Sequence, residues 1–230
     1  MDDRFHVSQY GQCKVVDELC YPNNTGEHRG IFIEVGASDG YTLSNTYWFE
    51  KVRNWSGLVV EPIPQWVDQL QHNRWCDIYN GCVYIKDGTV DFLHIDGYSQ
   101  MISGIKEGYH QSYYNRVQKE IEQHKQKTNI LNVNCITLNS LIKQFNTSKN
   151  RPENAVIDYL SLDCQTAELH VLYNYEYSEN PCKTISIDIN GLNKEPILEW
   201  FSDNGFRQHW KHQYADEYIF VNDSINWSWN

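Results

Sequence analysis

The chain has 230 residues and a formal net charge of -11, from 30 acidic and 19 basic side chains. This length suits one α/β domain with a full core, so we expect a single domain over residues 1–230. The acidic balance argues against a nucleic-acid partner, because such proteins gain affinity by neutralising phosphates with Lys and Arg.

The cysteines and the hydropathy predict the compartment. The seven cysteines are odd in number and include no Cys-x-x-Cys pair, which is typical of a reduced intracellular protein. The first residues, Met1 to Arg4, do not resemble a secretion signal, and no apolar run approaches the roughly 20 residues that span a bilayer. We therefore expect a cytoplasmic protein without a membrane partner. The sequence leaves open whether it is a monomer or a homodimer.

A buried strand over residues 31–35 is predicted to lead directly into a turn with two glycines and two acids. Gly36 and Gly40 permit backbone angles and close ligand approach that a Cβ would block. Glu34 and Asp39 place negative charge where a phosphate-binding loop avoids it. A cationic sulfonium with a free amino group, as in S-adenosylmethionine, is compatible with carboxylates. The loop therefore favours methyl transfer over dinucleotide redox chemistry.

The following segments alternate between helix and strand. Residues 44–51 predict a helix, residues 58–62 a strand that ends at Pro62, and residues 65–73 a second helix. This βαβα order is typical of a parallel sheet with crossover helices.

An inserted hairpin is predicted next. Residues 77–84 predict a third strand, and a turn at 86–89 leads into the alternating residues 90–94. The polar stretch 108–128 predicts a solvent-facing helix or a mobile lid over the site, and residues 131–135 predict an edge strand.

The last part of the chain returns to α/β alternation. Four apolar residues with helical spacing predict a helix over 138–145, and residues 146–154 predict an exposed loop. The further predicted elements are strands at 157–163 and 183–190, a helix at 196–204, and a closing antiparallel pair at 206–212 and 217–221.

Acidic side chains follow three of these strands, where ligands of open α/β sheets bind. Glu61 is predicted to accept both ribose hydroxyls of a nucleoside cofactor, or alternatively to cap the turn before Pro62. Asp163 and Asp188 bring two carboxylates near the centre of the crevice. Three roles stay open for them: ligands of Mg²⁺ or Mn²⁺ that help deprotonate a sugar hydroxyl, a helix cap with an ion pair, or a direct general base.

Three ordered motifs carry a resemblance to a known family. Residues 32–40 with Ser44-Asn45, then Glu61-Pro62, then 157–163 followed by Ala167-Glu168-Leu169 resemble the FkbM family of S-adenosylmethionine-dependent methyltransferases, over a core of about 9–221. The resemblance implies a class I methyltransferase fold, Rossmann-like α/β, with a seven-stranded mostly parallel sheet, an antiparallel final strand and an inserted hairpin. It also implies an O-methyltransferase acting on a sugar or glycan, similar to the glycan O-methyltransferases of large algal viruses, which would act in the host cytoplasm.

The resemblance also implies roles for single residues. The methionine moiety lies against the first loop, Glu61 takes the ribose, and Cys82 and Val83 flank the adenine. The residues expected to bind the cofactor are Glu34, Gly36, Ala37, Ser38, Asp39, Gly40, Ser44, Asn45, Glu61, Pro62, Cys82, Val83 and Asp163. The expected catalytic residues are Asp163 and Asp188, which with Glu168 are also the candidate ligands of a Mg²⁺ or Mn²⁺ ion.

One turn departs from the family pattern. Members usually read Asp-x-Glu-Gly after the fourth strand, whereas this chain has Asp163-Cys164-Gln165-Thr166. Gln165 keeps the shape of the glutamate but not its charge. A second interpretation is therefore a catalytically lapsed module that keeps the cofactor pocket and binds a glycan. A third, an NAD-dependent oxidoreductase, is disfavoured by Asp39 and by the lack of a third glycine at the Gly-x-Gly-x-x-Gly spacing.

Overall fold

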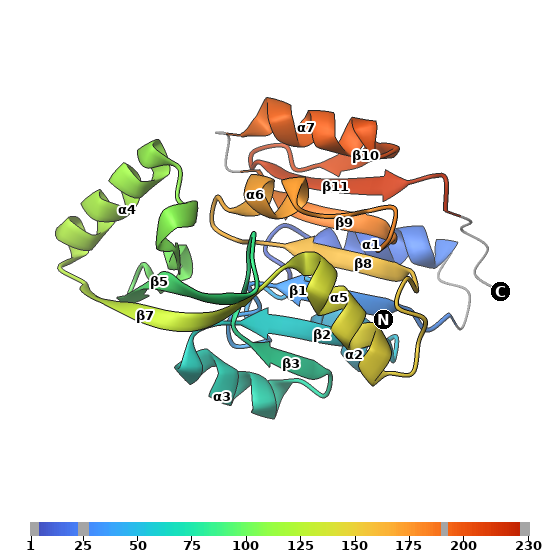
Figure 1. Ribbon diagram of the computed structural model, residues 1–230, viewed down its shortest axis with the longest axis horizontal. Coiled ribbons are helices and arrows are strands. Elements are labelled where there is room, and N and C mark those ends of the chain that lie inside the picture. The colour runs from blue at the N-terminus through green and yellow to red at the C-terminus, as the bar shows by residue number, and fades with distance from the viewer. Residues whose placement is uncertain (1–4, 23–27, 190–192, 226–230) are drawn as a thin grey trace.

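A seven-stranded sheet forms the centre of the computed structural model, which describes residues 5–22, 28–189 and 193–225 (Figure 1). The spatial order of its strands is β10-β11-β9-β8-β1-β2-β3. All neighbours pair in parallel except β11, which is antiparallel to both β9 and β10. The strands are β1 (Ile31–Val35), β2 (Ser56–Glu61), β3 (Asp77–Asn80), β8 (Ile157–Leu162), β9 (Cys182–Asp188), β10 (Phe206–Lys211) and β11 (Glu217–Asn222). The predicted mostly parallel sheet with an antiparallel final strand is confirmed.

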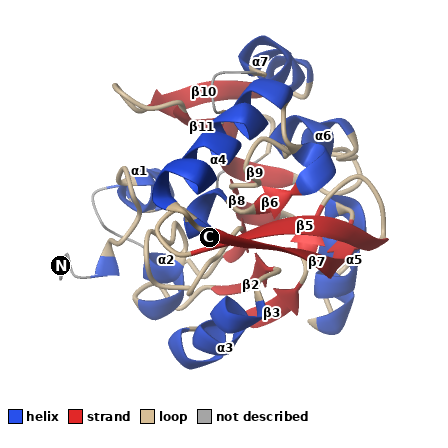
Figure 2. Ribbon diagram, turned by 90° about the vertical axis from the view of Figure 1, so that its left-hand side faces the viewer, coloured by secondary structure: helices blue, strands red, loops and turns tan. Residues whose placement is uncertain are grey.

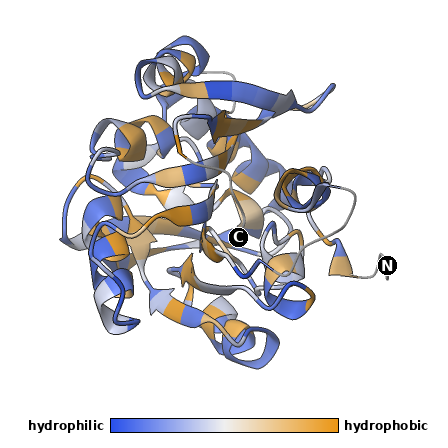
Figure 3. Ribbon diagram, turned by 90° about the vertical axis from the view of Figure 1, so that its right-hand side faces the viewer, coloured by the Kyte–Doolittle hydropathy of each residue, from blue (hydrophilic) through white to orange (hydrophobic). Residues whose placement is uncertain are grey.

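Helices cover both faces of this sheet, so that the molecule has three layers (Figure 2). Alternate residues of a strand point to opposite faces. Phe32 therefore packs against α1 (Gln12–Cys20) and α2 (Tyr47–Lys51), together with Leu70 of α3 (Pro64–Asn73). Ile33 and Val35 belong to the core on the other face, under α5 (Leu138–Ser148), α6 (Glu168–Tyr173) and α7 (Lys194–Asp203). Figure 3 shows the apolar inner strands between helices whose outer surfaces are hydrophilic.

A smaller four-stranded sheet lies beyond the carboxyl ends of the central strands. Its order is β4-β7-β5-β6, and its strands are β4 (Cys82–Val83), β5 (Gly88–Asp96), β6 (Gly104–Ile105) and β7 (Lys127–Ile136). The amphipathic helix α4 (Gln111–His124) buries Tyr113 and Val117 against Leu93 and Ile95 of β5. Its other side faces solvent, as expected, and Figure 1 shows this unit projecting from the central sheet.

The prediction of one strand over residues 77–84 is wrong, because the chain changes sheets at Gly81. A Cβ at Gly81 would lie 2.6 Å from the carbonyl oxygen of Asn134, so the two sheets meet too closely here for any side chain. The inserted hairpin does exist, but β5 pairs with β7 instead of with residues 77–84. The predicted edge strand over residues 131–135 is part of β7. In the described structure, residues 131–134 pair only with β5, as an edge strand would, whereas Cys135 also pairs with β4.

Several element boundaries also differ from the predictions. The helix α1 was not predicted, and α2 begins three residues after Ser44, whose hydroxyl accepts hydrogen bonds from the backbone N–H groups of Thr46 (3.2 Å) and Tyr47 (3.1 Å). The polar helix ends before residue 128, because Lys125 takes the left-handed conformation (φ 49°) and β7 begins at Lys127.

The remaining differences lie in the second half. The helix α5 continues to Ser148, so the predicted loop 146–154 begins later than expected. Strands β8 and β9 end at Leu162 and Asp188, and Asn190 lies outside the described residues.

No helix within residues 5–22, 28–189 and 193–225 has both the length and the hydropathy of a membrane span.

Candidate active site

The strand registers bring the predicted acids together at one edge of the sheet. Val35 of β1 pairs with Val60 of β2 and with Leu162 of β8, and Leu162 pairs with Ile187 of β9. The residues that follow therefore form the next row, which contains Gly36, Glu61, Asp163 and Asp188. The strand β11 runs in the opposite direction, so its first residue, Glu217, pairs with Asp188 at the same edge.

Two pockets and a cleft open at this edge. The first pocket, of about 570 Å³, lies between the central sheet and the four-stranded sheet. Its wall is largely apolar. Its lining includes Val83, Trp66, Phe92, Met101, Cys82, Pro62 and Glu61. An apolar slot with the carboxyl group of Glu61 in its wall fits a base and its ribose.

The second pocket, of about 550 Å³, lies between the β1–α2 loop and the ends of β8, β9 and β11. Its wall is polar, and it includes Glu34, Ala37, Ser44, Asn45, Gln12, Asp188 and Glu217. The two pockets share Val35, Gly36, Ser38, Met101 and Asp163. The two therefore adjoin at the end of β1, as two parts of one elongated ligand require.

A wider cleft opens beside both pockets. It is lined by Tyr10, Tyr113, Arg116, Gln165, Asp188, Tyr214, Asp216 and Glu217, in addition to Met101 and Asp163. Among the described residues, only Met101 and Asp163 line both pockets and the cleft. Asp163 is therefore the acid at the junction of all three spaces.

Glu61 joins the β1–α2 loop to the end of β2. Its Oε2 accepts a hydrogen bond from the backbone N–H of Ser38 (2.9 Å) and its Oε1 accepts one from the N–H of Ile63 (2.8 Å). Burial raises the pKa of Glu61 to about 8, although both of these bonds oppose the shift. The ribose and turn-capping interpretations are thus compatible, because the carboxyl group caps the turn and still lines the first pocket.

Gly36 and Gly40 are required for packing within the protein. A Cβ at Gly36 (φ 84°) would lie 2.3 Å from the carbonyl oxygen of Asp163, so the loop passes directly over the end of β8. A Cβ at Gly40 (φ 80°) would lie 2.5 Å from Leu70 and 2.8 Å from Arg74 of the α3 segment. Gly36 lines both pockets, but Gly40 is not among the lining residues of either.

Asp39 lies away from both pockets as well. Its Oδ1 accepts hydrogen bonds from the backbone N–H groups of Tyr41 (2.9 Å) and Thr42 (2.7 Å), and its Oδ2 accepts one from the Thr42 hydroxyl (2.6 Å). The carboxylate therefore caps its own exposed turn. The structure gives no contact that supports the predicted cofactor roles of Asp39 and Gly40.

We predict that Gly40→Ala destabilises the protein by about 3 kcal/mol or more, from the left-handed backbone together with overpacking. The matched control is Gly11→Ala, since Gly11 has a similar φ of 84° but no atom within 4 Å of its added Cβ. That variant is expected to lose only about 1 kcal/mol. Denaturant unfolding of both variants measures the difference, and equal losses would contradict the assigned role of the contacts with Leu70 and Arg74.

Asp163 has an environment that suits proton transfer near neutral pH. Burial, and secondly the charge of Asp188, raise its pKa to about 7, while a hydrogen bond from Gln165 acts in the opposite direction. In that bond the side-chain amide of Gln165 donates to Oδ1 of Asp163 over 2.8 Å. The amide oxygen of Gln165 in turn accepts a hydrogen bond from the hydroxyl of Tyr113 (2.6 Å) on α4. Gln165 thus connects the acid to the helix beside the cleft.

The departure from the family pattern has a structural counterpart at Thr166. This β-branched residue has φ 78°, in the left-handed region where glycine is favoured. Its hydroxyl donates to the carbonyl of Gly108 and accepts from the N–H of His110, both over 3.2 Å. These two bonds offset part of the strain and attach the turn to the segment that leads into α4.

The predicted metal site is not assembled. Within the described part of the chain, no three His, Cys, Asp or Glu side chains are placed to hold a metal ion together. Glu168 is buried, and its Oε1 accepts a hydrogen bond from the backbone N–H of Cys164 (2.6 Å). Asp163 and Asp188 therefore lack their predicted third partner.

Sequence reasoning missed several residues of the site. Glu217 could have been found, because an antiparallel last strand begins at the edge where parallel strands end. Met101 and Tyr113 come from the inserted unit, whose pairing the sequence did not reveal. Arg74, which contacts the β1–α2 loop from beneath, follows a helix and carries no local signal.

Comparison with known proteins identifies the family. A protein-family model, the methyltransferase FkbM domain, matches residues 34–219 of this chain. Among solved structures, methyltransferase FkbM from Methylobacillus flagellatus KT superposes with a TM-score of 0.51 at 10% identity, over 84% of this chain and 43% of that chain. The METTL16 MTase domain gives a TM-score of 0.50 at 8% identity, over 94% of this chain and 67% of that chain.

At these identities the likeness to solved structures shows the fold alone, and this chain spans less than half of the bacterial protein's structure. No curated protein matches. From the family model and the fold together, the chain belongs to the FkbM methyltransferase family.

Proposed function

We propose that this methyltransferase uses S-adenosylmethionine to methylate a sugar hydroxyl of a glycan. The observation that carries the proposal is the position of Asp163, which lines both pockets and the open cleft. A donor held across the two pockets and an acceptor in the cleft would meet at this carboxylate.

The first pocket would hold the adenosyl part. Trp66, Phe92 and Val83 offer apolar surface for the base, and Cys82 lies at the same wall. Glu61 would accept hydrogen bonds from the ribose hydroxyls, since each of its oxygens has one further lone pair beyond its bond to a backbone N–H.

The second pocket would hold the amino-acid part. The side-chain oxygen of Asn45 is buried and has no hydrogen-bond partner in the described structure, whereas its amide nitrogen donates to Ser161 (3.0 Å). A buried acceptor without a partner is costly unless a ligand satisfies it. The ammonium group of the methionine moiety would supply the missing donor.

The cleft would bind the acceptor. It combines the aromatic faces of Tyr10, Tyr113 and Tyr214 with carboxylates and amides that accept hydrogen bonds from hydroxyl groups. Aromatic faces and polar tips of this kind suit the apolar faces and hydroxyl edges of sugar rings. The net charge of -11 also favours a neutral acceptor over a polyanion.

S-adenosylmethionine supplies a methyl group already activated on a sulfonium. In the transfer, the acceptor oxygen bonds to the methyl carbon, the carbon–sulfur bond breaks, and the hydroxyl proton passes to the carboxylate of Asp163. The protein lowers the barrier mainly by aligning donor and acceptor. Gln165 orients Asp163 for this role, since its side-chain amide donates to Oδ1.

The direct test is incubation of the protein with S-adenosylmethionine and oligosaccharides that contain rhamnose, fucose or xylose, analysed by mass spectrometry. We expect a gain of one methyl group on at least one of them. A protein that binds S-adenosylhomocysteine but methylates no glycan under these conditions would favour the binding-module interpretation.

The pH dependence of transfer should report Asp163. Because the ionised carboxylate accepts the proton, kcat at saturating cofactor is expected to rise with pH through the pKa of about 7. Asp188→Asn removes a charge that helps raise this pKa, so the rise should move to lower pH. Asp203→Asn, at the exposed end of α7, serves as the control and should leave the profile in place. An unshifted Asp188→Asn profile would contradict the assignment.

A further inference from the structure

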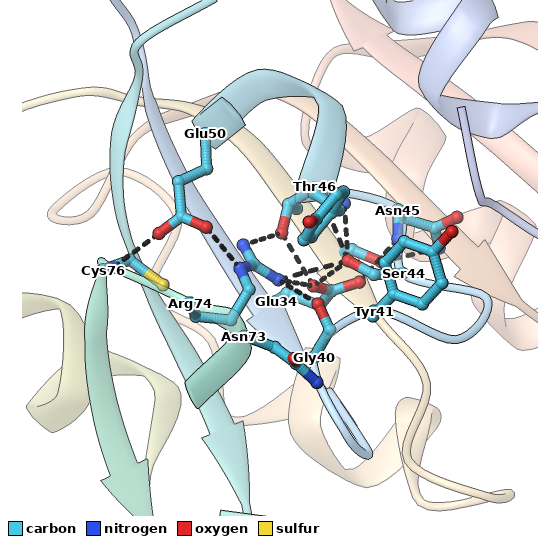
Figure 4. Close-up of polar contacts among 12 residues, drawn as sticks. Glu34, Gly40, Tyr41, Ser44, Asn45, Thr46, Glu50, Asn73, Arg74 and Cys76 are labelled. Carbon is cyan, nitrogen blue, oxygen red and sulfur yellow. Dashed lines mark hydrogen bonds and ion pairs between the residues drawn. The ribbon is translucent and has the colours of Figure 1, made fainter. Parts of the chain in front are cut away.

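The side chain of Arg74 is completely buried, and it is not among the residues that line either pocket. Arg74 follows the last residue of α3, and its guanidinium is surrounded by acceptors from the β1–α2 region (Figure 4). Its Nε donates to Glu50 (2.6 Å), its Nη2 to Thr46 (2.8 Å), and its Nη1 lies 3.2 Å from acceptors of Glu34, Gly40 and Ser44.

Glu50 of α2 fixes the arginine on one side. Besides the guanidinium, its carboxylate accepts hydrogen bonds from the backbone N–H groups of Trp75 (2.7 Å) and Cys76 (2.5 Å). Burial opposes the ionisation of Glu50, but the charge and hydrogen bond of Arg74 outweigh it and lower its pKa. This pair therefore gives Arg74 a single orientation beneath the loop.

The other hydrogen bonds of Arg74 reach Glu34 on β1 and three residues of the loop that borders the second pocket, Gly40, Ser44 and Thr46. Oε2 of Glu34 also accepts the hydroxyls of Ser44 (2.8 Å) and Thr46 (2.7 Å), while Oε1 accepts the backbone N–H of Asn45 (2.6 Å). Asn45 and Ser44 line the second pocket. Arg74 and Glu34 thus hold Ser44 and Asn45 in place, and they do so through hydrogen bonds within the protein.

We propose that Arg74 is a positioning residue, which holds the loop over residues 40–46 in the conformation that binds the amino-acid part of the cofactor. This inference rests on the proposed function, because it assigns the methionine moiety to the second pocket. Lysine cannot replace this arginine, since a single ammonium group lacks the planar fork that reaches Glu50, Thr46 and Gly40 at once. Without the guanidinium, two buried carboxylates and a loop carbonyl lose their shared donor.

The test compares the affinity for S-adenosylhomocysteine by calorimetry in the wild type, Arg74→Lys, Thr46→Val and Arg53→Met. We expect about 10-fold weaker binding or more for Arg74→Lys, and about 3- to 10-fold weaker binding for Thr46→Val, which loses one hydroxyl but keeps its shape. Thr46 is buried and does not line the pocket. In both variants the KM for the donor should rise, while kcat at saturating donor should change less.

Arg53→Met is the matched control. Arg53 also makes a largely buried two-bond pair, with Asp17 (2.7 and 2.6 Å), but this carboxylate belongs to α1 instead of to the loop. Its loss should destabilise the protein yet leave cofactor affinity within about 2-fold. If Arg74→Lys does not fold, Thr46→Val carries the test alone. Wild-type affinity in the folded Thr46→Val and Arg74→Lys variants overturns the inference, whereas a wild type that does not bind at all overturns the proposed function.

Discussion

The Asp163→Asn variant is expected to bind S-adenosylhomocysteine with nearly wild-type affinity but to transfer methyl groups at least about 100-fold more slowly. Asparagine keeps the size of the side chain and an oxygen that accepts the bond from Gln165, so only the charge is lost. Because this carboxylate lies at the junction of both pockets and the cleft, its loss removes the proton acceptor without emptying either donor pocket. Single-turnover transfer and calorimetry measure the two quantities separately.

The control for this prediction is Asp91→Asn, which makes the same chemical change at an exposed position of β5 outside these three spaces. Its transfer rate should equal that of the wild type. A rate for Asp163→Asn within about 3-fold of wild type would show that the acceptor loses its proton elsewhere.

The second large effect is expected from Glu61→Ala, which should weaken the binding of S-adenosylhomocysteine by about 100-fold or more. Two hydrogen bonds from the ribose to a carboxylate account for a loss of this size. The backbone N–H groups of Ser38 and Ile63 also lose their acceptor, so the turn above the first pocket is no longer fixed. Calorimetry measures the affinity, and thermal unfolding measures the accompanying loss of stability.

Asp39→Ala is the contrasting variant, since the family resemblance implies that Asp39 binds the cofactor as Glu61 does. The structure places Asp39 in its own exposed turn, so its replacement should change the affinity by less than about 3-fold. Equal losses for the two variants would mean that the loop adopts another conformation around the cofactor.

Glu61 also predicts a pH dependence of binding. Ribose hydroxyls donate to the ionised carboxylate, so binding should strengthen as pH rises through its pKa of about 8, and below that pH binding should release a proton. Calorimetry in two buffers of different ionisation enthalpy detects this release in the wild type, and the release should be absent in Glu61→Ala.

Local patterns were sufficient to predict the strand that precedes the β1–α2 loop and the glycines and acids of the loop. The apolar run of β1, the glycines after it and the acids that end β2, β8 and β9 all lie within short stretches, and parallel pairing then aligns them at one edge. The seven-stranded, mostly parallel sheet with an antiparallel final strand was implied by the resemblance to the family, and the family model and the structural matches confirm the fold.

The parts that were not predicted depend on contacts distant in sequence. Cys135 pairs with Cys82 across the inserted unit, and no local signal distinguishes this pairing from a hairpin of residues 77–84 with the next strand. Gly40 looked like a ligand-binding glycine, but its missing Cβ makes room for Leu70 and Arg74 instead. Such a contact appears only when α3 is packed beneath the loop.

The turn after β8 explains how the chain tolerates its departure from the family pattern. Gln165 bonds to Asp163 on one side and to Tyr113 on the other, a role that an amide fills because it both donates and accepts. An ionised glutamate could accept from Tyr113 but could not donate to Asp163. The altered turn thus retains an ordered site without the second acid.

The most direct test of the central claim is calorimetric titration of the wild-type protein with S-adenosylhomocysteine and, separately, with NAD. We predict saturable binding of one S-adenosylhomocysteine per chain and no binding of NAD, because the two adjoining pockets meet at Asp163 and the loop carries acids instead of a pyrophosphate cradle. Binding of NAD without binding of S-adenosylhomocysteine would contradict it.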